Sequence, residues 1–176
     1  AVQSWGTLDI LVNNVGTNIR KKTVDYNDDE YDTIMNTNLR STFELARLCY
    51  PFLKQSEQGD IVNISSVAGV AHVRTGAIYG MSKAALLQLT RNLAVEWASD
   101  NIRVNAVAPW YIHTPLAEPV LKNEAYKTAV LERTPMNAIG KPEDVAAAVA
   151  FFCLPAAAYI TGQCLCVDGG FSINAF

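Results

Sequence analysis

Short apolar runs that end in polar or small residues recur along the chain and predict buried parallel strands. Three of them cover residues 8–14, 60–66 and 102–109, and a fourth covers residues 163–170. Runs of this length are too short for most helices, and their nearly continuous apolar character is typical of strands that are covered on both faces. The segments between them are long enough for the helical crossovers that parallel strands require.

Helical patterns occupy the intervening segments. The first begins near Asp28, with acidic residues in its first turn, and has an apolar stripe formed by Tyr31, Ile34, Met35, Leu39, Phe43, Ala46 and Leu53. The second runs from about Tyr79 to Ala98 and is apolar around most of its circumference. One sheet face cannot cover so much apolar surface, so we expect a second protein molecule against the remainder. The last helix runs from Pro142 to about Cys153.

The order of these elements predicts the fold class. Strand, helix, strand, helix, strand, a proline-containing segment over 114–138, helix and strand form an α/β doubly wound parallel sheet of the Rossmann-like type. Short helical pieces between three prolines suggest that residues 114–138 form a mobile lid. We expect a single domain over residues 1–176 that is the carboxyl-terminal portion of such a fold. Because the chain has no initial Met and enters a strand almost at once, we favour a fragment of a longer protein over a natural truncation, with one edge of the first strand unpaired.

Composition narrows the possible functions. The chain has 176 residues, of which 50% are hydrophobic and 18% are charged, as expected for one soluble globular domain. With a net charge of −3 and scattered basic residues, nucleic acid and membrane surfaces are not expected partners, and we interpret the densest basic run, residues 18–22, as a solvated loop. Four cysteines without paired zinc-site spacing predict buried, reduced thiols, no metal site and a cytoplasmic location. No segment has the length of a membrane span or the order of a signal peptide.

Polar and small residues follow three of the predicted strands. Asn13, Asn14 and Gly16 follow the first strand, Ser65 and Ser66 end the second, and residues 109–114 follow the third. Ligands of doubly wound sheets bind outside the carboxyl ends of the strands. The sequence therefore predicts a ligand site at this edge.

Two tyrosine–lysine pairs have the spacing that places both side chains on one helical face: Tyr79 with Lys83, and Tyr50 with Lys54. Tyr50 precedes Pro51 and lies at the far end of a long helix. Tyr79 instead begins its helix shortly after the second strand, so its hydroxyl can fold back over the strand end. We predict that the Tyr79 pair is catalytic and that the Tyr50 pair is structural.

Tyr79, Lys83 and Ser66 suit carbonyl reduction and its reverse. A phenol has a pKa near 10, and a neighbouring ammonium lowers that pKa toward neutrality, as a cationic oxidised nicotinamide also would. Ser66 can donate a hydrogen bond to a carbonyl oxygen that gains negative charge. Asn38 lies on the apolar stripe of the first helix and needs a hydrogen-bond partner there. Its amide either bonds within its own helix or holds a water in a proton relay behind Lys83.

The motifs "NNVG", "NISS", "YGMSK" and "VDGG" occur in this order, and with them the whole chain resembles the short-chain dehydrogenase/reductase family. The resemblance assigns the family's catalytic tetrad to Asn38, Ser66, Tyr79 and Lys83. Within the family, "NIRKKT" and the segments 93–119 and 154–176 are most similar to the tropinone-reductase-like group. That group implies NADPH-dependent reduction of a ketone, often cyclic, with NAD not excluded.

The resemblance also implies further site residues. Asn13 would contact the ribose side of the cofactor, Val15 replaces the usual Ala near the adenosine side, and the Ile112 backbone and Thr114 would hold the nicotinamide carboxamide and phosphates. Trp110 and Tyr111 would shape the substrate pocket together with Ser66. The full cofactor-binding set is Asn13, Val15, Gly16, Tyr79, Lys83, Pro109, Ile112 and Thr114.

The sequence has no counterpart of the family's glycine-rich turn, which would hold the pyrophosphate. It also has no counterpart of the first three strands of the family fold. We therefore expect the isolated chain to bind cofactor weakly. Two alternatives stay open beside the reduction of a small ketone to an alcohol. One is a sugar-acid or 3-oxoacyl reductase, which a substrate panel would separate. The other is a catalytically silent assembly subunit, which would form mixed oligomers without activity. The family also implies a homodimer or homotetramer.

Overall fold

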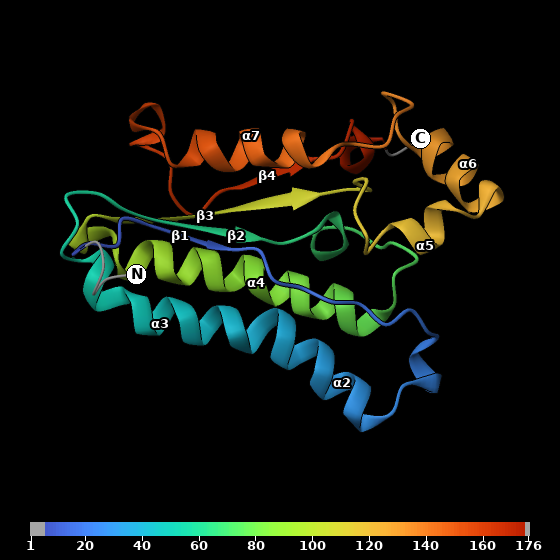
Figure 1. Cartoon of the computed structure of the whole chain (residues 1–176), viewed down its shortest axis with the longest axis horizontal. Helices are drawn as coiled ribbons and strands as arrows, with labels where there is room; N and C mark the ends of the chain where they lie inside the picture. Colours follow the sequence, from blue (N-terminus) through green and yellow to red (C-terminus); the bar gives the residue numbers. More distant parts are fainter. Residues whose placement is uncertain (1–5, 175–176) are drawn as a thin grey trace.

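The computed structural model describes residues 6–174 and contains a four-stranded parallel sheet between layers of helices (Figure 1). The strands are β1 (Ile10–Asn13), β2 (Gly59–Ile64), β3 (Ile102–Pro109) and β4 (Cys164–Val167), and they lie side by side in this order. Every neighbouring pair is parallel. The predicted doubly wound α/β fold is confirmed for this part of the chain; residues 1–5 and 175–176 of the predicted domain lie outside the described residues.

The helices occupy the predicted crossovers. Those between β1 and β2 are α2 (Asp28–Met35), a π-helical turn (Asn36–Arg40) and α3 (Ser41–Leu53), and the helix between β2 and β3 is α4 (Ala77–Glu96). Between β3 and β4 come α5 (Glu118–Leu121), α6 (Glu124–Arg133) and α7 (Pro142–Phe152). Short 3-10 turns cover Thr23–Asp25, Val67–Gly69, Ala98–Asp100, Pro155–Ala157 and Phe171–Ile173. In Figure 1, α3 and α4 cover one face of the sheet, α7 covers the other, and α5 and α6 lie beyond the carboxyl ends of the strands.

The central strands are buried on both faces because their side chains alternate between two apolar layers. Ile61 packs with residues of α3 and α4, whereas the adjacent Val62 packs with Phe152 of α7. The nearly continuous apolar runs of the sequence thus correspond to strands covered on both sides. At β1, in contrast, Ile10 and Val12 are 45% and 42% exposed, and within residues 6–174 this strand pairs only with β2.

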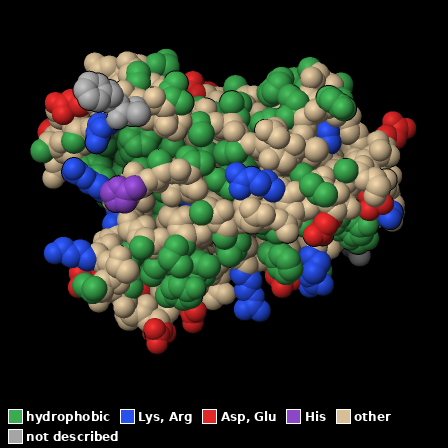
Figure 2. Space-filling model, turned by 180° about the vertical axis from the view of Figure 1, so that it is seen from behind, with side chains coloured by type: hydrophobic (Ala, Val, Ile, Leu, Met, Phe, Trp, Pro, Cys, Tyr) green, Lys and Arg blue, Asp and Glu red, His purple; other side chains and the backbone are tan. Residues whose placement is uncertain are grey.

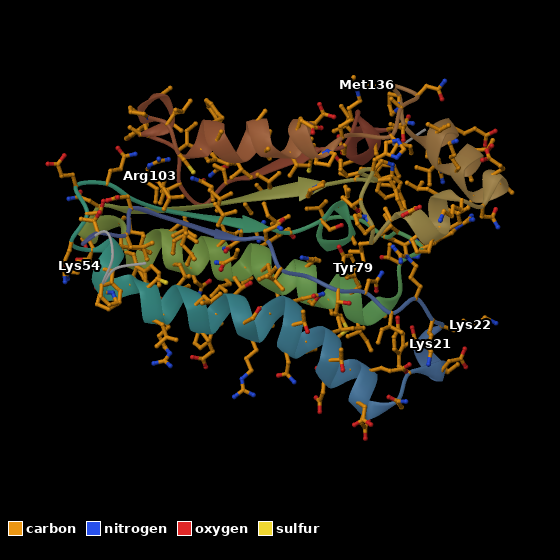
Figure 3. The ribbon with its side chains drawn as sticks, in the orientation of Figure 1. Lys21, Lys22, Lys54, Tyr79, Arg103 and Met136 are labelled. Atoms are coloured by element: carbon orange, nitrogen blue, oxygen red, sulfur yellow. The ribbon has the colours of Figure 1, made fainter. Side chains whose placement is uncertain are left out.

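A buried ion pair joins the two central strands at their amino-terminal ends. Asp60 and Arg103 are register partners in β2 and β3, and their side chains are 2.6 Å apart. The Arg103 guanidinium also donates to the backbone oxygens of Phe152 at 2.7 Å and Ala157 at 2.9 Å. Figure 3 shows Arg103 between the sheet and α7. Arg103 therefore fastens the end of α7 to the sheet.

The helical segment between β1 and β2 differs from the single helix predicted from Asp28 to Leu53. The π turn over Asn36–Arg40 interrupts it, and Tyr31 and Phe43 of the predicted apolar stripe are 41% and 46% exposed. A π turn contains one more residue than an α turn, so the apolar positions before and after it do not form one continuous face. Such turns occur often at functional sites, and this one contains Asn38.

No helix within residues 6–174 combines the length and the apolar character needed to cross a membrane.

Candidate active site

A cavity of about 590 Å³ lies at the carboxyl ends of β1, β2 and β3, where the sequence predicts a ligand site. Ligand pockets are commonly of this size. The predicted site residues that line it are Gly16, Ser66, Tyr79, Lys83, Pro109, Trp110, Tyr111, Ile112 and Thr114. Residues up to 98 positions apart in the sequence therefore meet in one space.

Tyr79 lies in the first turn of α4 and faces the strand ends (Figure 3). Burial raises the pKa of its phenol, while a hydrogen bond with Ser66 and the charge of Arg20 act in the lowering direction. The Lys83 ammonium is 5.7 Å from the centre of the Tyr79 ring. The net direction differs from the lowered pKa that the sequence predicts, because burial outweighs the nearby hydrogen bond and the Arg20 charge.

Lys83 is buried one helical turn after Tyr79. Its Nζ donates to the backbone oxygen of Ile64 at 2.8 Å, and burial lowers its pKa to about 8. Gly69 lets the turn over Val67–Gly69 lie close to α4, because a Cβ at Gly69 would lie 2.7 Å from the Lys83 carbonyl carbon. The end of β2 thus holds the ammonium within the cavity wall.

Ser66 follows β2 directly and begins the turn over Val67–Gly69, where its Oγ accepts from the Ala68 amide at 3.2 Å. Its neighbour Ser65 donates to the Lys83 backbone oxygen at 2.8 Å. Ser65 therefore ties the strand end to α4, and this tie sets Ser66 beside Tyr79.

The Asn38 side chain is completely buried and links two other elements. Its Oδ1 accepts from the Thr17 amide at 2.7 Å, and its Nδ2 donates to the Thr17 backbone oxygen at 2.9 Å and to Ser82 Oγ at 3.0 Å. The alternative of an amide bonded within its own helix is wrong, since all three of these bonds reach outside that helix. Asn38 joins the loop after β1 to α4 directly behind the cavity wall, and a role in a proton relay stays a prediction.

Two of the predicted cofactor residues lie outside the cavity lining. The Asn13 side chain donates to Asn63 Oδ1 at 2.9 Å, and Val15 is 66% exposed. Val12, Asn14 and Gly16 line the cavity instead. Alternation along the extended chain explains this result, because every second residue points to the same side. The same rule, applied to the sequence, could have selected Asn14 over Asn13.

The cavity includes residues that the sequence analysis did not select. Arg20 lines it, although the sequence placed it in a solvated loop. Other members come from the segment before α4, from the segment around α5 and from α7: Val73, Thr75, Leu116, Ala117, Pro142, Val145, Ala146, Val149 and Ala150. No local signal marks these residues, since their position depends on how the crossovers fold back over the sheet edge.

The segment after β3 packs as a small unit beside the cavity. The Trp110 ring stacks on Phe171 with a centroid distance of 3.7 Å, and its Nε1 donates to Thr134 Oγ1 at 3.1 Å. The Tyr111 and Tyr126 hydroxyls are 2.7 Å apart, and burial raises the Tyr111 pKa well above its usual range. These contacts attach the predicted lid to the part of the cavity wall that Trp110 and Tyr111 form. The mobility of the lid stays a prediction.

The second tyrosine–lysine pair has a structural role, as predicted. Tyr50 donates to Asp100 Oδ2 at 2.6 Å, and Lys54 forms an ion pair with Asp100 at 2.8 Å. Figure 3 shows Lys54 at one end of the molecule, far from Tyr79. The same four-residue spacing therefore occurs in a surface ion-pair cluster at Tyr50 and Lys54 and in the cavity wall at Tyr79 and Lys83.

The cavity fits the nicotinamide half of a dinucleotide. Val12, Ile64 and Val149 provide an apolar wall for a flat ring, and a Cβ at Gly16 would come within 3.2 Å of Lys83 Nζ, so a side chain there would crowd the ammonium. Asn14 and Thr114 supply polar groups on either side. No group of three or more His, Cys, Asp or Glu residues in the described part of the chain could hold a metal ion.

Comparison with known proteins agrees with this geometry. A family model described as Enoyl-(Acyl carrier protein) reductase matches residues 1–172. The chain belongs to the short-chain dehydrogenase/reductase family of oxidoreductases. Two Arabidopsis thaliana relatives, "Tropinone reductase homolog At5g06060" and "Tropinone reductase homolog At2g29360", are 58% and 55% identical to it over 97% of this chain. The predicted resemblance to the tropinone-reductase-like group is thereby confirmed.

Solved structures of the family have the same fold. A gluconate 5-dehydrogenase from Burkholderia cenocepacia J2315, solved with NADP and tartrate, is 30% identical with a TM-score of 0.94 and is matched over 98% of this chain and 68% of its own. An aldohexose dehydrogenase from Thermoplasma acidophilum is 34% identical with a TM-score of 0.91, over 98% of this chain and 71% of its own. The present chain spans 65% and 63% of the lengths of the two Arabidopsis relatives.

Proposed function

We propose that this chain provides the catalytic portion of an NADPH-dependent reductase that converts a ketone, most suitably a cyclic one, to an alcohol. The observation that carries the proposal is the convergence of Ser66, Tyr79 and Lys83 on one apolar cavity at the carboxyl edge of the sheet. The relatives described as tropinone reductase homologues support a ketone as substrate. The neighbour solved with NADP supports the choice of cofactor, with NAD as the alternative.

Each residue has a distinct part in the proposed reaction. When NADPH is bound, the chemistry that it supplies is hydride transfer. Ser66 donates a hydrogen bond to the carbonyl oxygen, and Tyr79 gives that oxygen its phenolic proton. Lys83 stabilises the phenolate that remains, because its ammonium is held near the ring, and Asn38 keeps the surrounding elements in place and takes part in returning the proton.

A chimera tests the proposal. The part of the At5g06060 relative that this chain does not match, which the family resemblance places upstream, is joined to residues 1–176 so that the site has its glycine-rich turn. NADPH and NADH oxidation are then followed with a panel of cyclic and open-chain ketones. Ketone-dependent NADPH oxidation that the Tyr79→Phe chimera lacks would support the proposal. A folded chimera that binds NADPH and reduces no ketone would refute it.

Cofactor binding by the 176-residue chain alone is a separate measurement. We expect a fluorescence titration to give weak NADPH binding, because the glycine-rich turn that the family resemblance implies for the pyrophosphate has no counterpart in the sequence. Micromolar binding would contradict this expectation and would mean that the present residues suffice.

Two alternatives remain distinguishable. A sugar-acid reductase is favoured by the structural neighbour solved with tartrate, and a 3-oxoacyl reductase would use the same side chains. Gluconate-type keto acids and 3-oxoacyl thioesters therefore belong in the substrate panel. A catalytically silent assembly subunit would show mixed oligomers with a full-length relative and no activity in the chimera.

We also propose that the protein forms homodimers or homotetramers in the cytoplasm. Apolar side chains remain exposed on α3 and α4: Phe43, Leu45, Leu48, Phe52, Met81 and Val95. Exposed apolar side chains that gather on neighbouring helices are typical of an interface. The four cysteines are free, and they are partly buried, whereas the sequence predicts full burial. Free thiols are typical of a reducing compartment. Analytical ultracentrifugation of the chimera would test the assembly.

A further inference from the structure

We propose that Arg20 recognises an anionic group on the substrate, so that the preferred substrate is an apolar ketone that carries a carboxylate. This inference rests on the proposed ketone reduction and adds a substrate class and a specificity-determining residue to it. Arg20 lies on the loop after β1, seven residues beyond the end of that strand.

The charges that line the cavity are all positive. Its described lining includes two ionisable cations, Arg20 and Lys83, and no Asp or Glu. The Lys83 ammonium already donates to the Ile64 backbone oxygen and lies 5.7 Å from the centre of the Tyr79 ring. Arg20 is therefore the cation that is available to a substrate.

The Arg20 side chain itself lacks a partner. Its Nε is buried without a hydrogen bond, and among residues 6–174 no carboxylate forms an ion pair with its guanidinium. Burial raises the pKa of Tyr79 and of Tyr111, and the Arg20 charge acts on both phenols in the opposite, lowering direction. A buried donor without a partner is costly, and a guanidinium suits a planar carboxylate with two parallel hydrogen bonds.

The backbone that carries Arg20 is held on both sides. Asn18 Nδ2 donates to the Thr75 backbone oxygen at 3.0 Å, and Tyr26 OH donates to the Ile19 backbone oxygen at 2.5 Å. Gly76 makes this arrangement possible, since a Cβ at that position would lie 2.1 Å from the Tyr26 hydroxyl oxygen. The guanidinium thus projects from a fixed loop, as a recognition residue requires.

A basic recess adjoins the cavity and shares Arg20 with it. Its other cationic lining residues are Lys21, Lys22 and Arg74, and its described lining contains no acidic residue. Figure 2 shows basic side chains on both sides of an indentation at one end of the molecule. In a chain with a net charge of −3, this concentration of positive charge would steer an anionic molecule toward the cavity mouth.

The rest of the cavity favours an apolar body over a polyhydroxylated one. Trp110, Val73 and Leu116 are among its lining residues. One cation among apolar walls matches a molecule with a single anionic group, whereas a sugar acid would leave most of its hydroxyls without partners.

The test compares two probes of nearly equal shape on the chimera described above: 4-oxocyclohexanecarboxylate and its neutral primary amide. We expect Arg20→Gln to lower kcat/KM for the carboxylate about tenfold to a hundredfold, while that for the amide changes less than about twofold. Arg20→Lys should restore part of the carboxylate activity. Lys54→Gln is the matched control, because it removes one positive charge from a lysine that is paired with Asp100 and lines neither the cavity nor the basic recess (Figure 3 labels Lys54). Both probe constants should stay unchanged in this control.

Other outcomes would overturn the inference. Equal losses for both probes in Arg20→Gln would mean that Arg20 acts through Tyr79, and the pH profile would then shift as well. Weaker NADPH binding with unchanged probe preference would assign Arg20 to a cofactor phosphate. A strong preference for a 3-oxoacyl coenzyme A thioester over the keto acid would give the basic recess a different ligand.

A binding measurement separates this inference from the proposed ketone reduction. If the wild-type chimera reduces neither probe, isothermal titration with cyclohexanecarboxylate and cyclohexanecarboxamide in the presence of NADPH still reports on Arg20. Binding of the carboxylate that the Arg20→Gln variant loses would support anion recognition although the proposed reaction had failed. Absence of carboxylate binding by the wild type would refute it.

Discussion

Lys83 should destabilise the folded chain at neutral pH, and its replacement by Met should show by how much. Burial lowers the pKa of this ammonium from its ordinary value of 10.5 to about 8. This difference corresponds to about 3 kcal/mol against the charged form in the folded state, at about 1.4 kcal/mol per pKa unit. The Met variant avoids this cost but leaves the Ile64 backbone oxygen without its donor, which costs about 1–2 kcal/mol. At pH 7 we expect the variant to be more stable by about 1–2 kcal/mol.

The pH dependence gives the sharper test. A lysine whose pKa is lowered on folding contributes stability that is present above pH 10.5 and is lost as the pH falls through about 8. Between pH 7 and pH 9.5 the wild type should therefore gain about 2 kcal/mol relative to Lys83→Met, and the advantage of the variant should disappear. Urea unfolding followed by circular dichroism at both pH values measures the two differences.

The second tyrosine–lysine pair offers a matched control. Lys54 is exposed, and its hydrogen bonds with Asp100 and Tyr50 raise its pKa. Its contribution to stability is therefore present at neutral pH and lost only as the pH rises beyond its ordinary pKa, so Lys54→Met should destabilise slightly or not at all, with little change between pH 7 and pH 9.5. A difference between Lys83→Met and the wild type that did not vary with pH would refute the burial argument.

Three further predictions follow from the same contacts. In the chimera, Tyr79→Phe should lower kcat for ketone reduction about 10²- to 10⁴-fold while the NADPH dissociation constant stays within about twofold, as single-turnover and titration experiments would show; a variant with near-normal kcat would remove Tyr79 from the chemistry. Arg103→Met should lower the unfolding free energy by about 3–5 kcal/mol, because it leaves the buried Asp60 carboxylate unpaired. Asp60→Asn should lower it by less, because Arg103 keeps its backbone acceptors, and equal losses in urea unfolding would contradict this order. Gly76→Ala should destabilise the chain by more than about 1 kcal/mol, since its φ of 96° disfavours a side chain and the new Cβ would meet the Tyr26 hydroxyl; an unchanged melting temperature would argue against this contact.

Much of the fold, and the location of the predicted catalytic residues, follow from local sequence patterns. The strand at 102–109 has the observed bounds, β1 and β4 lie within the predicted runs, and β2 begins one residue before its predicted run. The agreement arises because buried parallel strands need nearly continuous apolar residues. The Tyr79–Lys83 pair was separable from Tyr50–Lys54 because one pair follows a strand end and the other precedes a helix end. Proline at the start of α7 marked that helix for a similar local reason.

Other features depend on contacts between distant segments. The π turn at Asn38, and the three bonds by which its amide joins Thr17 and Ser82, have no signature in residue spacing. Selecting Asn14 instead of Asn13 as a cavity residue depends on which residues of the extended chain point toward the cavity. The raised pKa of Tyr79 depends on how deeply the phenol is buried.

Arg20 illustrates the difference most clearly. Within the sequence it belongs to a run of basic residues, and such runs are usually solvated. The sequence by itself determined which residues can form strands and helices and which can act as acids and bases, since those properties are local. Only the tertiary structure decided which charges lie inside the cavity, because that outcome depends on how the loop after β1 is held against the segment before α4.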